Sequence, residues 1–311
     1  MQNKKIITAN CGDDSISIIE KACPDKLETI YLRDLVVKNN KVIEFQTGDK
    51  IGPTSLSLDS SGNLLVVNAY DDSLFRIDLE RKILTDGLKL GRYPTVIQIY
   101  GNRIFILNSD SDSLSVVDEE ELVLVESIHI DGRPSDMKID EERKSLYIVS
   151  SNSHNLNIID LNFHRLNILG IPSQPLKIKM EGDLIFIMGF VNNGILGYSN
   201  LFAIEKMAYR MIWYREIKGI YYDFIKIKGL DYFYLINAED GHLYELDIRS
   251  GRLQRKTRVG NLPNNIVYDG HDRLYINDLL NGQIFIVNLG DMSKIERYIK
   301  VGKEPQDILL L

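Results

Sequence analysis

Lysine and aspartate side chains that alternate along short apolar strands are the residues of this sequence best suited to chemistry. Each strand follows a proline or a residue in its place. The third and fifth residues after that point are apolar, and the second and fourth are often polar. Alternate residues of a β-strand face opposite sides, so the polar set shares one face. The charged members of this face are Asp136, Lys138, Lys177, Lys179, Lys226 and Asp307.

Two interpretations of this charged face remain open. If the strands line a central channel, four lysines converge there in a chain whose net charge is −7. They could hold a small anion, such as phosphate or a carboxylate, because low-dielectric walls focus the field of fixed charges. In the other interpretation, the lysines pair with Asp136, with Asp307 and with water, and they only neutralise a wet channel.

An aromatic stretch from Tyr198 to Phe224 contains the single tryptophan of the chain. Tyr, Trp, Met and Arg are enriched where proteins meet, so the stretch also suits a surface for a protein partner. The alternative is that its rings belong to the core. The candidate partner residues are Tyr198, Phe202, Tyr209, Trp213 and Tyr214.

Sequence motifs predict no catalytic residue, no metal site and no cofactor. The acidic turns at residues 13–15 and 71–73 look like parts of calcium loops, but no bidentate Glu follows them, so we interpret them as turn formers. The five histidines lack a metal spacing such as His-x₃-His. No Gly-x-Ser-x-Gly elbow, phosphate loop or Cys-x-x-Cys pair is present. An enzyme is not excluded, because repeated units can assemble a site from separate parts of the chain.

Repeated β-hairpins are the elements that must position these residues. Residues 64–78, LLVVNAYDDSLFRID, join two apolar runs through Asn, Asp and Ser, which is typical of a hairpin. Further copies, some weaker, make seven in all: residues 6–20, 105–118, 146–160, 185–199, 234–247 and 274–288.

A second repeat runs in step with the hairpins. A Gly-x-x-Pro or similar lead-in recurs every 40 to 47 residues, if Tyr222 stands in for one missing proline. This period, with four strands per unit, predicts an all-β, seven-bladed β-propeller of four-stranded antiparallel blades. After Pro305 one strand remains, and the chain begins with a hairpin. We therefore expect the N- and C-terminal strands to close the ring in one blade, with residues 1–311 as a single domain.

The segment between Glu20 and Pro53 is longer than the repeat requires. It spans 33 residues, against 16 between Asp78 and Pro94. Asn39-Asn40 lies between two apolar runs, residues 27–32 and 42–46, and suggests an added hairpin. Either run could be the outer strand of its blade.

The composition and the positions of the cysteines limit the classes of partner and the compartment that we expect for this protein. A pI near 5.4 makes nucleic acid an unsuitable partner. The sequence contains no run of 18 apolar residues, which is the length a membrane-spanning helix needs. The first ten residues lack the apolar stretch of a signal peptide. Cys11 and Cys23 should be too far apart for a disulfide, so we expect free thiols. These features predict a cytoplasmic protein, and we expect a monomer.

The hairpins resemble the YVTN-type repeat of seven-bladed, WD40-like propellers. That repeat has a Tyr-Val-Thr-Asn strand, a small polar turn and a Val-x-Val-Ile-Asp strand, which appear here as LYIVSSNSHNLNIID and IFILNSDSDSLSVVD. Its Gly-x-x-Pro lead-in is matched at Gly91…Pro94, Gly260…Pro263 and Gly302…Pro305. The resemblance covers nearly the whole chain and implies the propeller fold of surface-layer-like and uncharacterised bacterial proteins. It implies no activity, because fold does not carry function.

Three functional hypotheses follow from the sequence. The first is a non-enzymatic binding or scaffold propeller that engages a protein or a small anionic ligand at the channel mouth or through residues 198–224. The second is a cytosolic lactonase-like hydrolase or metal-dependent lyase, which shares this fold but needs a convergent His, Glu or Asp cluster. The third is a structural coat or assembly component. Lysines on the inner strands favour the first.

Overall fold

The computed structural model describes residues 5–38, 49–162, 165–192 and 197–311. They contain seven four-stranded antiparallel sheets, and the fold is a seven-bladed β-propeller, as predicted. The described residues form two compact units, here named the first unit (Met1–His129, Leu279–Ile284 and Ile299–Leu311) and the second unit (Ile130–Asp278 and Phe285–Tyr298).

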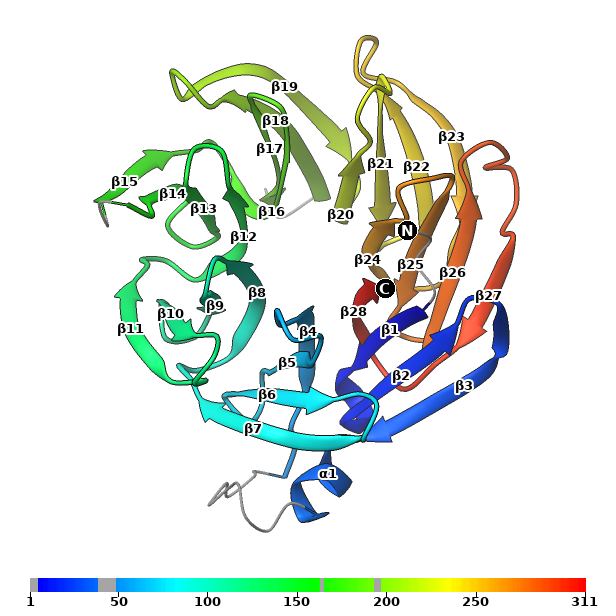
Figure 1. Cartoon of the computed structure of the whole chain (residues 1–311). Helices are drawn as coiled ribbons and strands as arrows, with labels where there is room; N and C mark the ends of the chain where they lie inside the picture. The colour runs from blue at the N-terminus through cyan, green and yellow to red at the C-terminus, as the bar shows by residue number, and fades with distance from the viewer. Residues whose placement is uncertain (1–4, 39–48, 163–164, 193–196) are drawn as a thin grey trace. The chain divides into compact units, whose positions relative to one another are not determined.

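Three blades belong to the first unit. Figure 1 labels their strands. Their strands are β28 (Pro305–Leu310), β1 (Lys5–Asn10), β2 (Ser15–Glu20) and β3 (Cys23–Tyr31); β4 (Pro53–Leu58), β5 (Leu64–Asn68), β6 (Ser73–Asp78) and β7 (Ile83–Lys89); and β8 (Pro94–Tyr100), β9 (Arg103–Asn108), β10 (Ser113–Asp118) and β11 (Leu124–His129). The pairing of β28 with β1, with Ile6 opposite Leu310, confirms that the two terminal strands share one blade.

Three blades belong to the second unit, and a further sheet completes the seven. The strands of the second unit are β12 (Pro134–Asp140), β13 (Ser145–Ser150), β14 (Asn155–Asp160) and β15 (Arg165–Gly170); β16 (Gln174–Glu181), β17 (Leu184–Asn192), β18 (Gly197–Glu205) and β19 (Arg210–Lys218); and β20 (Tyr221–Lys226), β21 (Tyr232–Asn237), β22 (His242–Asp247) and β23 (Leu253–Arg258). The remaining sheet is β24 (Pro263–Tyr268), β25 (Arg273–Asp278), β26 (Gln283–Asn288) and β27 (Arg297–Lys300). We call β4, β8, β12, β16, β20, β24 and β28 the inner strands.

Apolar faces of neighbouring blades form the core. In the second unit, Tyr147 and Val149 of β13 pack in one cluster with Ile178 of β16 and Phe202 of β18, all fully buried. In the first unit, Leu65 and Val67 of β5 pack with the β9 residue Ile106 in the same way. Burial of such apolar surface stabilises the fold by roughly 25 cal/mol per Å².

The acidic hairpin turns tie one blade to the next. Asp14 has φ of 53° and Asp72 has φ of 50°, a left-handed conformation that ends each turn. The Asp14 carboxylate accepts hydrogen bonds from the backbone N–H groups of Ile51 (2.9 Å) and Gly52 (2.8 Å), just before β4. Asp72 accepts one from Tyr93 N–H (2.8 Å), just before β8. These contacts match the interpretation of the turns as structural.

The long segment after β2 differs from the expected hairpin. Strand β3 pairs with β2 and contains most of the first apolar run, so this run supplies the outer strand. Helix α1 (Leu32–Lys38) follows it directly, and it packs Leu32 and Leu35 into the core. These leucines are three residues apart, on one face of a helix. The second run, 42–46, lies outside the described residues.

Two further expectations concern the cysteines and membrane insertion. Cys11 is buried and Cys23 is exposed, and both are free thiols. Within the described ranges, no helix has both the length and the apolar character that crossing a membrane requires.

Candidate anion site on the inner strands

A bulge after the lead-in residue sets the direction of each inner-strand side chain. In β12, Pro134 lies opposite Ser150, but Asp136 lies opposite Val149, so one residue is skipped. Such a bulge reorients the residues that follow it. Asp136 and Lys138 then share one face, while Met137 between them is fully buried in the other direction.

Strand β20 corrects the alignment drawn from the sequence. Tyr221 lies opposite Asn237, which is the place that Pro134 takes opposite Ser150. Tyr221, not Tyr222, therefore stands in for the proline, and every assignment on this strand moves by one residue.

The shift makes Asp223 the counterpart of Asp136, a residue that sequence analysis missed. It also takes Lys226 off the face of Lys138, so the assignment of Lys226 to the charged face was wrong. The Lys226 ammonium pairs with Glu181 (2.9 Å), and it donates to the carbonyl oxygen of Leu230 (2.7 Å).

Three aspartates at this inner-strand position connect adjacent strands. Asp136 accepts from N–H of Met137 (2.9 Å) on its own strand and from N–H of Ile178 (3.0 Å) on β16. Asp223 does the same with Phe224 (2.8 Å) and, more weakly, with Ile266 of β24 (3.4 Å). These carboxylates are structural acceptors.

Asp307, in the first unit, repeats the arrangement. Its carboxylate accepts from N–H of Ile308 (2.9 Å) on β28 and from N–H of Leu56 (2.9 Å) on β4. It therefore has the role of Asp136 in its own unit. The described contacts assign it to blade packing.

Lys179 pairs with a carboxylate that the sequence did not predict as its partner. Its ammonium lies 3.1 Å from Asp223 Oδ1, and the Asp223 side chain is almost fully buried. We expected the lysines to pair with Asp136 and Asp307, but Lys179 pairs with Asp223 instead. Lys177 precedes Lys179 by two residues on β16 and alternates onto the same face.

Lys138 stands apart from the other lysines of the second unit. Within the part of the chain that the structure describes, its ammonium has no hydrogen bond and no ion pair closer than 4 Å. Burial lowers the pKa of this ammonium, and the charges of Lys179 and Lys177 lower it further, while Asp136 and Asp223 act to raise it.

The aromatic stretch divides between core and surface. Phe202 is fully buried in the cluster around Ile178, so its assignment to a partner surface was wrong. Its place on β18, the third strand of the blade, explains this. Trp213 is half-buried against Phe233 (ring centroids 5.7 Å apart), with the Arg215 guanidinium over its ring.

The remaining aromatic candidates are more accessible. Tyr214 is exposed, and its hydroxyl donates to Glu216 (3.3 Å). Tyr198 is half-buried, and Tyr209 is half-buried beside Tyr147. Met207 and Ile212, which sequence analysis did not single out, are more exposed than Tyr214.

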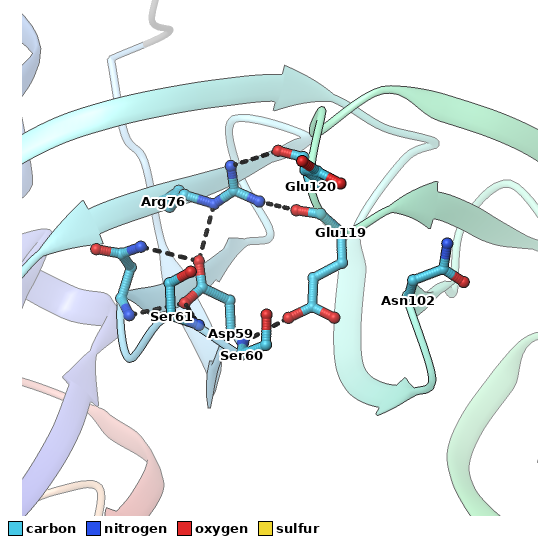
Figure 2. A pocket seen from close by; sticks show the side chains of 8 residues that line it. Asp59, Ser60, Ser61, Arg76, Asn102, Glu119 and Glu120 are labelled. Atoms are coloured by element: carbon cyan, nitrogen blue, oxygen red, sulfur yellow. Dashed lines mark hydrogen bonds and ion pairs between the residues drawn. The ribbon is translucent and has the colours of Figure 1, made fainter.

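A polar pocket in the first unit was not predicted (Figure 2). Its volume is about 290 Å³. Its lining is Asp59, Ser60, Ser61, Asn63, Arg76, Asn102, Glu119 and Glu120.

The contacts of this pocket are structural. The Arg76 guanidinium, at its centre, pairs with Asp59 (3.1 Å) and donates to the carbonyl oxygens of Glu119 and Glu120. Asp59 also accepts from N–H of Asn63 (2.8 Å), which closes the β4–β5 turn. Both terminal nitrogens of the arginine already donate to groups of the first unit. Elsewhere, no group of three His, Cys, Asp or Glu among the described residues is arranged to hold a metal ion.

Comparison with known proteins supports the fold and not an activity. No family model matches the chain, and no curated protein matches it. The resemblance to YVTN-type proteins is therefore supported only as a seven-bladed propeller.

Among solved structures, the chain is similar to a "putative 6-phosphogluconolactonase" from Bacteroides uniformis (11% identity, all of both chains, TM-score 0.75). It is also similar to one from Bacteroides fragilis, with 13% identity, coverage of 100% of this chain and 98% of the other, and a TM-score of 0.74. A third similar structure is apo AztD from Citrobacter koseri, with 14% identity, the same coverage of the two chains and a TM-score of 0.64. At such identities the likeness shows the fold alone.

Proposed function

We propose that this chain is a binding protein that holds a small anion on inner strands β12 and β16. One observation carries the proposal: Lys138 has no partner in the described structure, while both aspartates near it are already engaged. A cation without a partner in a partly buried place is costly. A phosphate or carboxylate would supply the missing charge and the missing hydrogen bonds.

The surroundings of Lys138 support an anion over further internal pairing. Asp136 already accepts two backbone N–H groups, and Asp223 already pairs with Lys179. Lys177 and Lys179 add positive charge on the neighbouring strand, which lies beside β12. The two free thiols suit a reducing compartment, so we place this function in the cytoplasm.

Calorimetry with inorganic phosphate and with 6-phosphogluconate tests the proposal. The variants are Lys138→Ala, Lys138→Arg, which keeps the charge, and Lys256→Ala, which removes an exposed lysine of β23 as the control. A hydrogen bond to a charged group contributes roughly 1.5–3 kcal/mol. Lys138→Ala should therefore weaken binding by about tenfold or more, with Lys256→Ala close to the parent. If the parent binds neither anion, the proposal is wrong.

A second candidate is a hydrolase of phosphorylated sugar lactones. It is favoured by two similar structures whose descriptions read "putative 6-phosphogluconolactonase", combined with lysines that suit a phosphate group. Acid release from 6-phosphogluconolactone, followed at constant pH, distinguishes the two functions. Binding without acceleration above the spontaneous rate supports the binding protein. Acceleration that Lys138→Ala abolishes supports the hydrolase.

A further inference from the structure

The outer strand of one blade in the second unit has a charge opposite to that of the whole chain. Strand β23 contains Arg255, Lys256 and Arg258 and no acidic residue, whereas the chain has a net charge of −7. The outer strands of the other two blades of this unit differ, because β15 has one cation and β19 includes Glu216 among its cations. Every residue of β23 except Thr257 is exposed.

Most of the cations along β23 lack a carboxylate partner. Arg255 is the exception, since it pairs with the buried carboxylate of Glu245. Lys256, Arg258 and, in the turn before the strand, Arg252 have no carboxylate within 4 Å among the described residues. Arg258 donates only to neutral oxygen atoms. The strand therefore carries positive charge that its own blade does not neutralise.

A further cation reaches this strand from the neighbouring blade. A Cβ atom placed on Gly251, in the turn before β23, would lie 2.8 Å from Nε of Arg215. This arginine belongs to β19, and in the part of the chain that the structure describes it too has no carboxylate within 4 Å. Cations thus follow β23 from the turn that precedes it to its last residue.

Strand β23 is also an edge strand. It ends the order β20-β21-β22-β23, and its backbone pairs with β22 on one side. Residues 253–258 have no other backbone partner within the described ranges. An unpaired edge can accept a strand from another protein. Lysine and arginine discourage pairing with an edge of like charge, and the same charges favour an acidic strand.

We propose that the outer edge of β23 binds an acidic, extended segment of a partner protein, which adds to the blade as a further strand. Lys256 and Arg258 are alternate residues and share one face, so carboxylates at alternate positions of the added strand can pair with both. The free N–H and C=O groups of the edge match a peptide backbone, and a nucleic acid has no such ladder of groups. The proposal does not depend on the anion site.

Fluorescence anisotropy with the full chain tests the proposal. The probe is a labelled peptide that alternates Glu and Thr, and the matched probe alternates Lys and Thr. We expect the acidic peptide to bind about tenfold more tightly or better, and to bind more weakly as salt is added, because salt screens exposed charges. The acidic peptide with methylated backbone nitrogens keeps its charge but lacks N–H donors, so its binding should be lost.

Two variants locate the site. Lys256→Glu combined with Arg258→Glu should weaken binding of the acidic peptide by about tenfold or more, because opposite charges across the strands become like charges. Lys144→Glu makes the same kind of change at an exposed lysine of another blade of this unit, and its binding should stay close to that of the parent. Melting temperatures show whether the variants are folded. In the parent, the acidic peptide should also slow hydrogen exchange of the amides of residues 253–258.

Three results would overturn the proposal. One is a parent chain that does not prefer the acidic peptide, or a folded charge-reversal variant that still binds it as the parent does. Another is equal binding of the methylated peptide, because charge alone would then explain the contact. The third is displacement of the acidic peptide by a single-stranded DNA of equal charge at a lower concentration than the unlabelled peptide requires, which would assign the edge to nucleic acid.

Discussion

The Asp136 carboxylate on β12 accepts a hydrogen bond of 3.0 Å from the backbone N–H of Ile178 on β16, and so connects two blades. Its other oxygen accepts from Met137 N–H on its own strand. An aspartate that the sequence assigns to a ligand channel therefore belongs to the packing of the fold. The same position in β20 and β28 is also aspartate, with the same pair of contacts.

Asp136→Ala should destabilise the protein. The substitution leaves two N–H groups without an acceptor, at a cost of about 1–3 kcal/mol each. Urea unfolding measures the loss. The control is Asp231→Ala, which removes an exposed ion pair with Arg249 and should cost at most about 1 kcal/mol. Equal losses in the two variants would contradict the structural role of Asp136.

Lys179 and Asp223 should be energetically coupled. Their side chains lie 3.1 Å apart, with Asp223 almost fully buried and Lys179 mostly so. A double-mutant cycle of Lys179→Met and Asp223→Asn should give a coupling of about 1–3 kcal/mol in the free energy of unfolding. Additive single effects would show that the pair contributes nothing.

Lys206→Met should be strongly destabilising and should reduce the acid sensitivity of the protein. Lys206 and Asp140 form a buried ion pair at 2.6 Å, and removing one partner of such a pair costs about 3–5 kcal/mol. Burial alone would raise the pKa of Asp140. The hydrogen bonds from Lys206 and from Arg143 N–H outweigh it, so this pKa lies below its ordinary value of 3.8.

The sign of the pH effect follows from this shift. A lowered pKa in the folded protein gives stability that is complete above pH 3.8 and is lost as the pH falls through the folded pKa. Denaturant unfolding from neutral pH down to this range measures it. In Lys206→Met the decline should be shallower than in the parent. An unchanged decline would assign the acid sensitivity to other groups.

The two cysteines should react at very different rates. Burial raises the pKa of the Cys11 thiol from 9.0 to about 11, although a hydrogen bond with Tyr70 opposes the rise. Its thiolate is then roughly a hundredfold scarcer at neutral pH, and thiolate is the reactive form. A chromogenic disulfide reagent should modify exposed Cys23 quickly, and Cys23→Ser should remove the fast phase. A fast phase that survives in Cys23→Ser would contradict this.

The sequence by itself determined the blade count, the four-strand unit and the shared terminal blade. These properties follow from short-range patterns: hairpins with Asn, Asp and Ser turns, and a lead-in that recurs every 40 to 47 residues. Hairpin turns and apolar alternation act between residues close in the chain, so they can be read without knowing the neighbouring blade. The free state of the two thiols followed from the same local geometry.

Only the tertiary structure decided which charged groups meet. Where Tyr221 replaces the proline, a slip of one residue moves every side chain of β20 to the other face, and only pairing with β21 settles the register. The partners of Lys179 and of Asp136 lie on neighbouring blades about forty residues away. Among the described residues Lys138 has no partner, and this too depends on what other strands bring near it, which no local pattern encodes.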